Sequence, residues 1–320
     1  MQRIIECVPN FSEGRDLSKI ERIVAPFKNQ ENFKMISYEP DADYNRTVVT
    51  LIGEVEAIME ALIPFVKNCI EEIDMNHQSG EHPRIGAVDV IPFIPIQNVT
   101  IEDCVNFANT MGEKIAALFD IPVFLYAKAA RTEDRISLPN IRKGEYEGMK
   151  EKIKEVAWHP DFGKPATHPT FGSVAVGARD FLVAFNIDLA TDNEKTASTL
   201  AKTIRQSSGG FQHIQAGPAF LEKQGHMQVT MNILDYAKNP IYRILEVIKF
   251  EALRYHVAVK SSEIIGLVPK QALLDSVKYY LQVQQIPYDK SMDLETLTAY
   301  AIKYLQFRDF NKTKIVEYWI

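Results

Sequence analysis

Short apolar runs alternate with longer amphipathic stretches over the first 126 residues, and this pattern predicts a sheet with helices packed on it. Short runs of β-branched or aromatic residues are typical of strands, whereas apolar residues three or four positions apart are typical of helices. Thr100 with Asp103 three residues on indicates a capping box at a helix start. We predict strands at 3–9, 33–39, 47–53, 87–94 and 121–126, and helices at 17–27, 55–73 and 100–119.

The second half of the chain shows the same order of elements without repeating the sequence. Residues 128–172 are rich in charge, proline and glycine, which indicates a connecting region with one short helix at 145–156. The run FLVAFNIDL then predicts a strand that opens a second unit near Gly177. We predict strands at 181–189, 214–222, 227–234 and 263–268, and helices at 193–206, 241–255, 269–283 and 294–307.

The first half therefore follows the order strand, helix, two strands, helix, strand, helix, strand, which is related to the ferredoxin-like pattern, and the second half follows the order strand, helix, two strands, helix, strand. We expect an α/β (α+β) fold of two such domains, each a mixed sheet with packed helices, with a substrate cleft between them. The length of 320 residues supports two domains, since a single core usually stops growing near roughly 250 to 300 residues. The expected N-terminal catalytic domain covers 1–178, the C-terminal domain 179–285 and a helical extension 286–320.

Composition limits the classes of partner that the protein is expected to bind. The 36 basic and 42 acidic residues leave no excess of positive charge for a nucleic acid, and no apolar run approaches the roughly 20 residues that span a bilayer. The N-terminal run is typical of a first strand and not of a signal peptide. The three cysteines are widely spaced within apolar patterns, which indicates reduced core thiols. A cytoplasmic enzyme or binding protein is expected.

The segment GEHPRIGAVDVIPFIP, from Gly80 to Pro95, contains the first candidate for chemistry. Its apolar part predicts a strand covered on both faces, and Glu81, His82 and Arg84 come just before it. Polar groups at the mouth of a rigid strand are held in place yet stay accessible. Histidine, with a pKa of about 6.5, can both take and give a proton near neutrality. An ordinary loop histidine before a proline is the alternative, and the segment alone does not decide between them.

Other common site signatures do not occur. The histidines lack HxxxH or HExxH spacing and the cysteines lie far from them, so no metal site is expected. The glycines form no dinucleotide fingerprint or Walker loop, and there is no GxSxG elbow for an acyl-enzyme. If the protein is an enzyme, direct transfer by acid-base catalysis is the mechanism that needs the fewest catalytic groups.

A series of ordered motifs over residues 1–285 resembles the glutamate formiminotransferase family. Many motifs in the right order are far more specific than any single one. The resemblance implies transfer of a formimino group from N-formimino-L-glutamate to N5 of tetrahydrofolate, its co-substrate, in histidine degradation, by a form that lacks the cyclodeaminase domain. The motifs are ECVPNFSEG (6–14), NRTVVTLIG (45–53), GEHPRIGAVDVIPFIP (80–95), IPVFLYAKAA (121–130), IRKGEYEG (141–148), PDFG (160–163), GARDFLVAFNI (177–187) and GLVP (266–269).

The resemblance also implies catalytic roles. His82 matches the catalytic histidine of the family, which would remove a proton from N5 and return one to the departing glutamate nitrogen, an effect on the order of 10²- to 10⁴-fold in rate. A carboxylate is expected to orient this histidine or stabilise a cation. Glu39 aligns with an acid of the family's active site, and Asp41 and Asp43 remain rivals for this role.

Binding residues follow from the same resemblance. Both substrates carry the carboxylates of a glutamate moiety, and planar pairing favours arginine as their partner. Arg46 and Arg84 are expected to bind them, together with Asn10 and Asn45, although Asn10 could simply cap a turn and each arginine could form an ordinary ion pair. The folate-binding stretch of the family aligns with Gly163, Lys164, Pro165, Ala166, Thr167, His168, Pro169, Thr170, Phe171 and Gly172.

Two other functions remain open at this point. The nearer is a transferase that uses N-formylglutamate, which would need the same histidine but would have to stabilise an oxyanion. The more distant is a folate-binding module without catalysis, against which the intact GEHPR segment argues. A homodimer is expected from the resemblance only.

Overall fold

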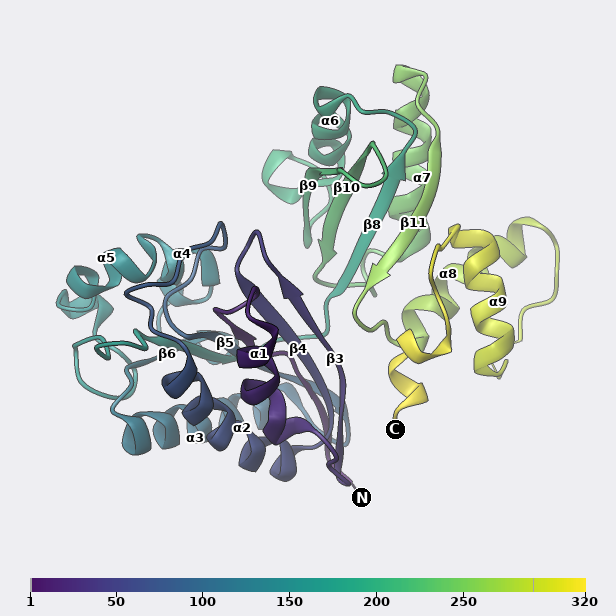
Figure 1. Ribbon diagram of the computed structural model, residues 1–320. Coiled ribbons are helices and arrows are strands. Elements are labelled where there is room, and N and C mark those ends of the chain that lie inside the picture. Colours follow the sequence, from purple (N-terminus) through teal and green to yellow (C-terminus); the bar gives the residue numbers. More distant parts are fainter. Residues whose placement is uncertain (1, 290) are drawn as a thin grey trace. The chain divides into compact units, whose positions relative to one another are not determined.

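The computed structural model describes residues 2–289 and 291–320 and divides the chain into two compact units between Asp180 and Phe181 (Figure 1). Each unit has its own sheet, and each has its own buried apolar core. The predicted α/β architecture is therefore confirmed. No helix within the described ranges is long and apolar enough to cross a membrane.

The first unit is built on a mixed sheet of seven strands. They are β1 (Ile4–Cys7), β2 (Asn10–Phe11), β3 (Phe33–Asp41), β4 (Arg46–Glu54), β5 (Val88–Gln97), β6 (Val123–Ala127) and β7 (Val174–Ala178). β1 and β2 both lie between β4 and β5, and β3 flanks β4, all in antiparallel pairs. β7 then pairs in parallel with β5 and β6. The sheet is therefore a ferredoxin-like set extended by two parallel strands.

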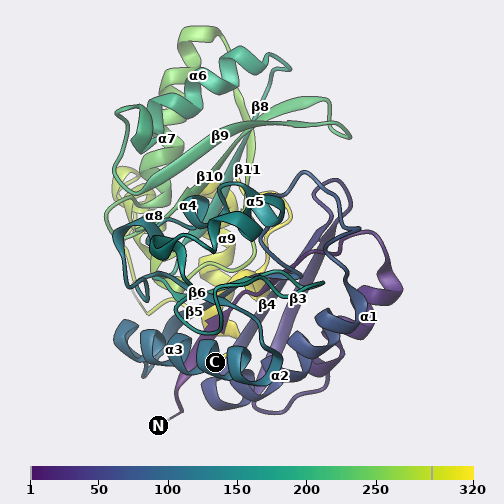
Figure 2. The ribbon, with the colours of Figure 1, turned by 90° about the vertical axis from the view of Figure 1, so that its left-hand side faces the viewer.

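Helices cover both faces of this sheet (Figures 1 and 2). They are α1 (Leu17–Val24), α2 (Val55–Glu72), α3 (Ile101–Phe119), α4 (Leu138–Arg142) and α5 (Glu145–Lys152). The first three pack their apolar sides on the larger core, whereas α4 and α5 contribute Ile141 and Met149 to a smaller cluster on the opposite face. The predicted capping box at Thr100 and Asp103 is present at the start of α3. One face thus carries the main core, and the other stays partly available for polar groups.

Among the strands and α-helices of the first unit, β2, α4 and β7 were not predicted. α4 is only five residues long and lies within the predicted connecting region. β7 has the sequence VAVGA, in which alanine and glycine weaken the strand signal. Gly177 is required in β7, because a Cβ there would lie 2.4 Å from the Tyr126 ring. The second unit begins at Phe181, the first residue of the run FLVAFNIDL.

The second unit contains a sheet of four strands. They are β8 (Val183–Leu189), β9 (Ile214–Leu221), β10 (His226–Ile233) and β11 (Val259–Ile265), with helices α6 (Glu194–Ile204), α7 (Ile241–Ala252), α8 (Lys270–Val283) and α9 (Leu294–Leu305). The spatial order is β11-β8-β10-β9 and every pair is antiparallel. The prediction of a mixed sheet in this half was wrong, because β10 lies between β8 and β9. These two strands run in the same direction but do not pair with each other. α6 and α7 lie along one face (Figure 2).

The C-terminal residues pack on this second unit. Leu297, Ala301 and Leu305 of α9 are fully buried in its core. Beyond α9, the backbone of Ser262 bonds with Gln306 and Arg308, so the segment pairs briefly with β11 at the edge of the sheet. The region that we expected as a separate extension thus shares the core of the second unit.

A polar network lies on the sheet face opposite α6 and α7, with Arg308 at its centre. Arg308 Nε donates to Asp188 Oδ2 at 2.7 Å, and Arg308 Nη2 lies 2.6 Å from Glu263 Oε2. Gln228 donates to the same two carboxylates at 2.8 and 2.7 Å. Burial alone would raise the pKa of Asp188, but hydrogen bonds from Ser261, Arg308 and Gln228 hold it below its ordinary value. The network therefore depends on Arg308 for its compensating charge.

We predict that Arg308→Met destabilises the protein by about 1 to 3 kcal/mol, measured as the free energy of unfolding in urea. A fully buried pair would cost about 3 to 5 kcal/mol, but the Arg308 side chain is 29% exposed, and solvent screens part of the effect. Arg254→Met is the matched control, because Arg254 pairs with Glu251 on the surface of one helix turn. Equal changes in both variants would contradict the prediction.

Candidate active site

His82 lies in a short loop held tightly at both ends. Gly80 and Gly86 lie at the two ends of the loop, and a Cβ on either would lie 2.3 Å or less from a backbone oxygen of another segment of the protein. The loop also bonds to the turn after β3, where Glu81 N donates to Asp43 O at 3.2 Å. These contacts place His82 just before β5 with 6% of its surface exposed. The loop thus presents an almost buried imidazole in a fixed position.

The two ring nitrogens of His82 face groups of opposite charge. Nδ1 lies 3.3 Å from Arg46 Nη1, and Nε2 lies 3.5 Å from Asp89 Oδ2 with no nearer partner among the residues described. Arginine can only donate, so Nδ1 must be the acceptor and the proton of the neutral ring lies on Nε2, towards Asp89. Burial lowers the pKa of His82, and the contacts with Asp89 offset this only in part. His82 is therefore neutral near pH 7.

Asp89 is held on the far side of the ring from Arg46. It is 1% exposed and accepts hydrogen bonds from Ile85 N at 3.1 Å and from Arg142 Nε at 3.0 Å, with a further bond from Arg142 Nη2. Burial would raise the pKa of Asp89, but His82 and Arg142 outweigh burial and hold it below its ordinary value. Asp89 is thus a fixed anion 3.5 Å from His82 Nε2.

Arg46 begins β4 and lacks a carboxylate partner in the described part of the chain. Its Nε is buried without a hydrogen-bond partner there, and its guanidinium lies 5.4 Å from the centre of the Tyr44 ring. Burial and nearby Arg142 lower its pKa, but a guanidinium keeps its charge in proteins. A half-buried cation of this kind suits an anionic ligand, since a buried charge is costly unless it is paired.

The other predicted binding residues have structural partners. Asn45, at φ 49°, accepts from Gly14 N and donates to Ser79 O, and so joins two loops beside Arg46. Asn10 donates to Val8 O within the β1–β2 segment. The guanidinium of Arg84 forms ion pairs with Glu145 and Glu147, at 2.7 and 2.8 Å. A substrate carboxylate could reach Arg84 only by displacing one of these partners.

The predicted acids lie near the site but do not contact His82. Asp41 accepts from the backbone N–H groups of Asp43 and Tyr44, and this turn leads into Arg46. Glu39 is exposed on β3 and accepts from Ser37 Oγ at 3.2 Å. The structure brings Asp89 to His82 instead, a residue that we did not select from the sequence. The available signal was a single carboxylate inside an apolar strand.

The predicted folate stretch forms a compact loop before β7. His168 and Gly172 exchange backbone hydrogen bonds of 2.9 and 3.1 Å, and Phe171 is fully buried in the first core. Lys164 lies 3.0 Å from Asp120. Gly163, Lys164, Pro165 and Ala166 are exposed, as is Pro169, while Thr167, His168 and Thr170 are half-buried. The exposed part of the loop, and not Phe171, is therefore open to a ligand.

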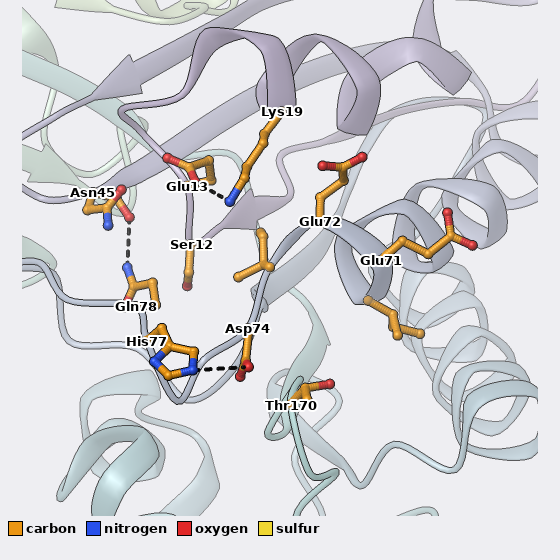
Figure 3. Close-up of a pocket in the computed structure, with 12 residues that line it drawn as sticks. Ser12, Glu13, Lys19, Asn45, Glu71, Glu72, Asp74, His77, Gln78 and Thr170 are labelled. Carbon is orange, nitrogen blue, oxygen red and sulfur yellow. Dashed lines mark hydrogen bonds and ion pairs between the residues drawn. The ribbon is translucent and has the colours of Figure 1, made fainter.

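A cavity of about 460 Å³ in the first unit shares Asn45 and Thr170 with the predicted site residues (Figure 3). Its wall does not include His82 or Arg46. Its charged residues are four acids, Glu13, Glu71, Glu72 and Asp74, with Lys19 and His77 as the bases. An excess of negative charge repels substrates that carry two carboxylates. The charge of this cavity therefore does not favour such a substrate.

Comparison with known proteins gives consistent matches over almost the whole chain. The family described as "Formiminotransferase domain, N-terminal subdomain" matches residues 4–179, and "Formiminotransferase domain" matches residues 184–320. The chain is 46% identical to the glutamate formimidoyltransferase of Streptococcus pyogenes serotype M1, over 91% of this chain and 98% of that protein. It is 43% identical to that of Thermoplasma acidophilum, over 88% and 93%. With the formimidoyltransferase-cyclodeaminase of Gallus gallus it shares 37% identity, over 89% of this chain and 54% of that protein.

Proposed function

This chain belongs to the formiminotransferase family, and we propose that it is a glutamate formimidoyltransferase that uses His82 as its acid-base residue. The reaction moves the formimino group of N-formimino-L-glutamate to N5 of tetrahydrofolate and releases L-glutamate, a step of histidine degradation. The observation that carries the mechanism is a neutral, almost buried imidazole between a fixed anion and a cation that has no carboxylate partner among the residues the structure describes.

The chemistry requires one proton to leave and one to arrive. N5 of tetrahydrofolate attacks the amidine carbon, which forms the new C–N bond and a tetrahedral intermediate. His82 Nδ1 takes the proton of N5 and then gives it to the glutamate nitrogen, whose bond to carbon breaks. Asp89 attracts the Nε2 proton and so orients the ring, and its negative charge stabilises the imidazolium. A single histidine thus serves both proton transfers.

Arg46 is the proposed receptor for a substrate carboxylate. Its guanidinium presents donors close to the ring of His82, and a charge-assisted pair with a carboxylate is stronger than its present contact with a neutral imidazole. Asn45 fixes the loop beside it. The carboxylate would therefore bind within reach of the base.

We place tetrahydrofolate near the loop Gly163–Gly172. The exposed backbone of Gly163 to Ala166 supports this, because loop N–H and C=O groups can bond to the edge of a pterin. Glu39 and Asp41 lie on the strand and turn that lead to Arg46, so contact of either with a substrate stays a prediction.

The test is release of glutamate by the purified protein with tetrahydrofolate and N-formimino-L-glutamate, beside equal concentrations of N-formylglutamate. We expect release from the formimino donor that depends on tetrahydrofolate. Release from the formyl compound alone would favour a formyltransferase. Absence of release from both, with folate still bound, would favour a binding module.

A further inference from the structure

We propose that Arg46 prevents His82 from acting as a base until the donor binds. In the free enzyme Arg46 donates a hydrogen bond to the lone pair of His82 Nδ1, and a carboxylate of the donor releases this lone pair by pairing with Arg46. This inference rests on the proposed function and adds a source of donor specificity to it. Arg46 would then determine how fast the donor reacts and not only how well it binds.

The hydrogen-bond pattern of His82 shows why the base is blocked. Nε2 carries the proton and faces Asp89, so the only lone pair of the neutral ring is on Nδ1. That lone pair points to Arg46 Nη1 at 3.3 Å. An imidazole in this state cannot accept a proton from N5 of the folate until the guanidinium moves.

Arg46 is held by fewer hydrogen bonds than Asp89. Asp89 is held by Arg142 and by Ile85 N, and it lies on the Nε2 side of the ring. Arg46 Nε has no hydrogen-bond partner among the described residues, and the acceptor of Arg46 Nη1 is a neutral imidazole. A carboxylate can accept two parallel bonds from a guanidinium, so it should displace the imidazole.

The surroundings of the ring favour the same response. The charged and titratable groups that face His82 are Arg46 from β4, Asp89 from β5, Arg142 from α4 and Tyr44 from the turn before β4. Two of them are cations, and a carboxylate on Arg46 cancels one. The imidazolium formed during the reaction then becomes easier to form, because one repulsive charge is neutralised.

The consequence is that an amidine without a carboxylate should react slowly even at saturation. Formamidine is the minimal donor: N5 would attack its carbon, the C–N bond to one nitrogen would break, and ammonia would leave with the proton that His82 took from N5. Glutarate supplies the missing carboxylates as a separate molecule. We expect glutarate to raise the formamidine rate at least about tenfold, as part of the 10²- to 10⁴-fold effect of a general base.

The experiment compares the wild type with Arg46→Met and Arg22→Met. Arg22 is the matched control, because its guanidinium already pairs with Glu72. Stimulation by glutarate should persist in Arg22→Met and vanish in Arg46→Met. Equal stimulation in Arg46→Met, or none in the wild type despite transfer from the full donor, would overturn the proposal.

A second measurement needs no variant and no turnover. ¹⁵N NMR of the wild type should show the Nε2–H tautomer of His82, and glutarate should raise the pKa of His82. A shift without any formimino transfer would support the control by Arg46 while refuting the proposed function. Transfer with an unchanged His82 resonance would refute the control by Arg46 and leave the function standing.

Discussion

His82→Ala is expected to lower kcat for formimino transfer by on the order of 10²- to 10⁴-fold, the range of a single acid-base residue. Without the imidazole, water must take the proton of N5 and protonate the departing nitrogen. The KM values should change little, because Arg46 and the folate loop remain. The measurement is the steady-state rate of glutamate release at saturating concentrations of both substrates.

His77→Ala is the matched control for this variant. His77 lies five residues before His82, but its side chain is 85% exposed and lies 3.8 Å from Asp74 in a surface pair. Its removal should leave kcat unchanged. A His82→Ala protein with normal kcat, or an equal loss in His77→Ala, would exclude His82 as the base.

The pH dependence of the wild type follows from the same site. Burial lowers the pKa of His82 from its ordinary value of 6.5, and only the neutral ring can accept a proton. The kcat/KM should therefore stay constant on lowering the pH through about 6.5 and decline only at more acidic pH. His82→Ala should lose this acidic limb.

Local sequence patterns predicted most elements because their causes are local. The capping box at Thr100 and the apolar spacing of α2 lie within single elements. The pairing of the second sheet depends instead on which strands become neighbours. The sequence of a single strand does not show that β10 lies between β8 and β9. Its antiparallel arrangement was therefore missed.

The candidate site shows the same division. His82 and Arg46 could be selected because their motifs are distinctive, and the structure places them 3.3 Å apart. Asp89 was missed because it stands in an apolar strand, where its role depends on Arg142 about fifty residues later. Asp41 is close to Arg46 in sequence, but the turn uses its carboxylate. Glu39 and Asp41 were selected by resemblance to the family, and a role for either in catalysis stays a prediction.

Asp89→Asn is expected to lower kcat by on the order of 10²- to 10⁴-fold although the side chain keeps its shape. The amide has one acceptor oxygen, and Arg142 and Ile85 N both donate to the present carboxylate. Asp89 Oδ2 faces both Arg142 and His82 Nε2, whereas Oδ1 faces Ile85 N. If the amide oxygen stays with Ile85 N, the amide N–H₂ takes the place of Oδ2 and points at the Nε2 proton of His82. The ring avoids this contact by moving its proton to Nδ1, which removes the lone pair that the reaction needs and leaves Arg46 Nη1 without its acceptor.

A loss of activity through unfolding would look different from a loss through this tautomer change. Asp89 raises the pKa of His82, so its neutralisation should move any residual acidic limb of the pH–rate profile to lower pH. ¹⁵N NMR should show the Nδ1–H form of His82 in the variant and the Nε2–H form in the wild type. A kcat within about threefold of the wild type would mean that Asp89 does not orient the base. An unchanged tautomer with a large loss of activity would assign the effect to charge alone, because Asp89 also offsets the imidazolium formed during transfer.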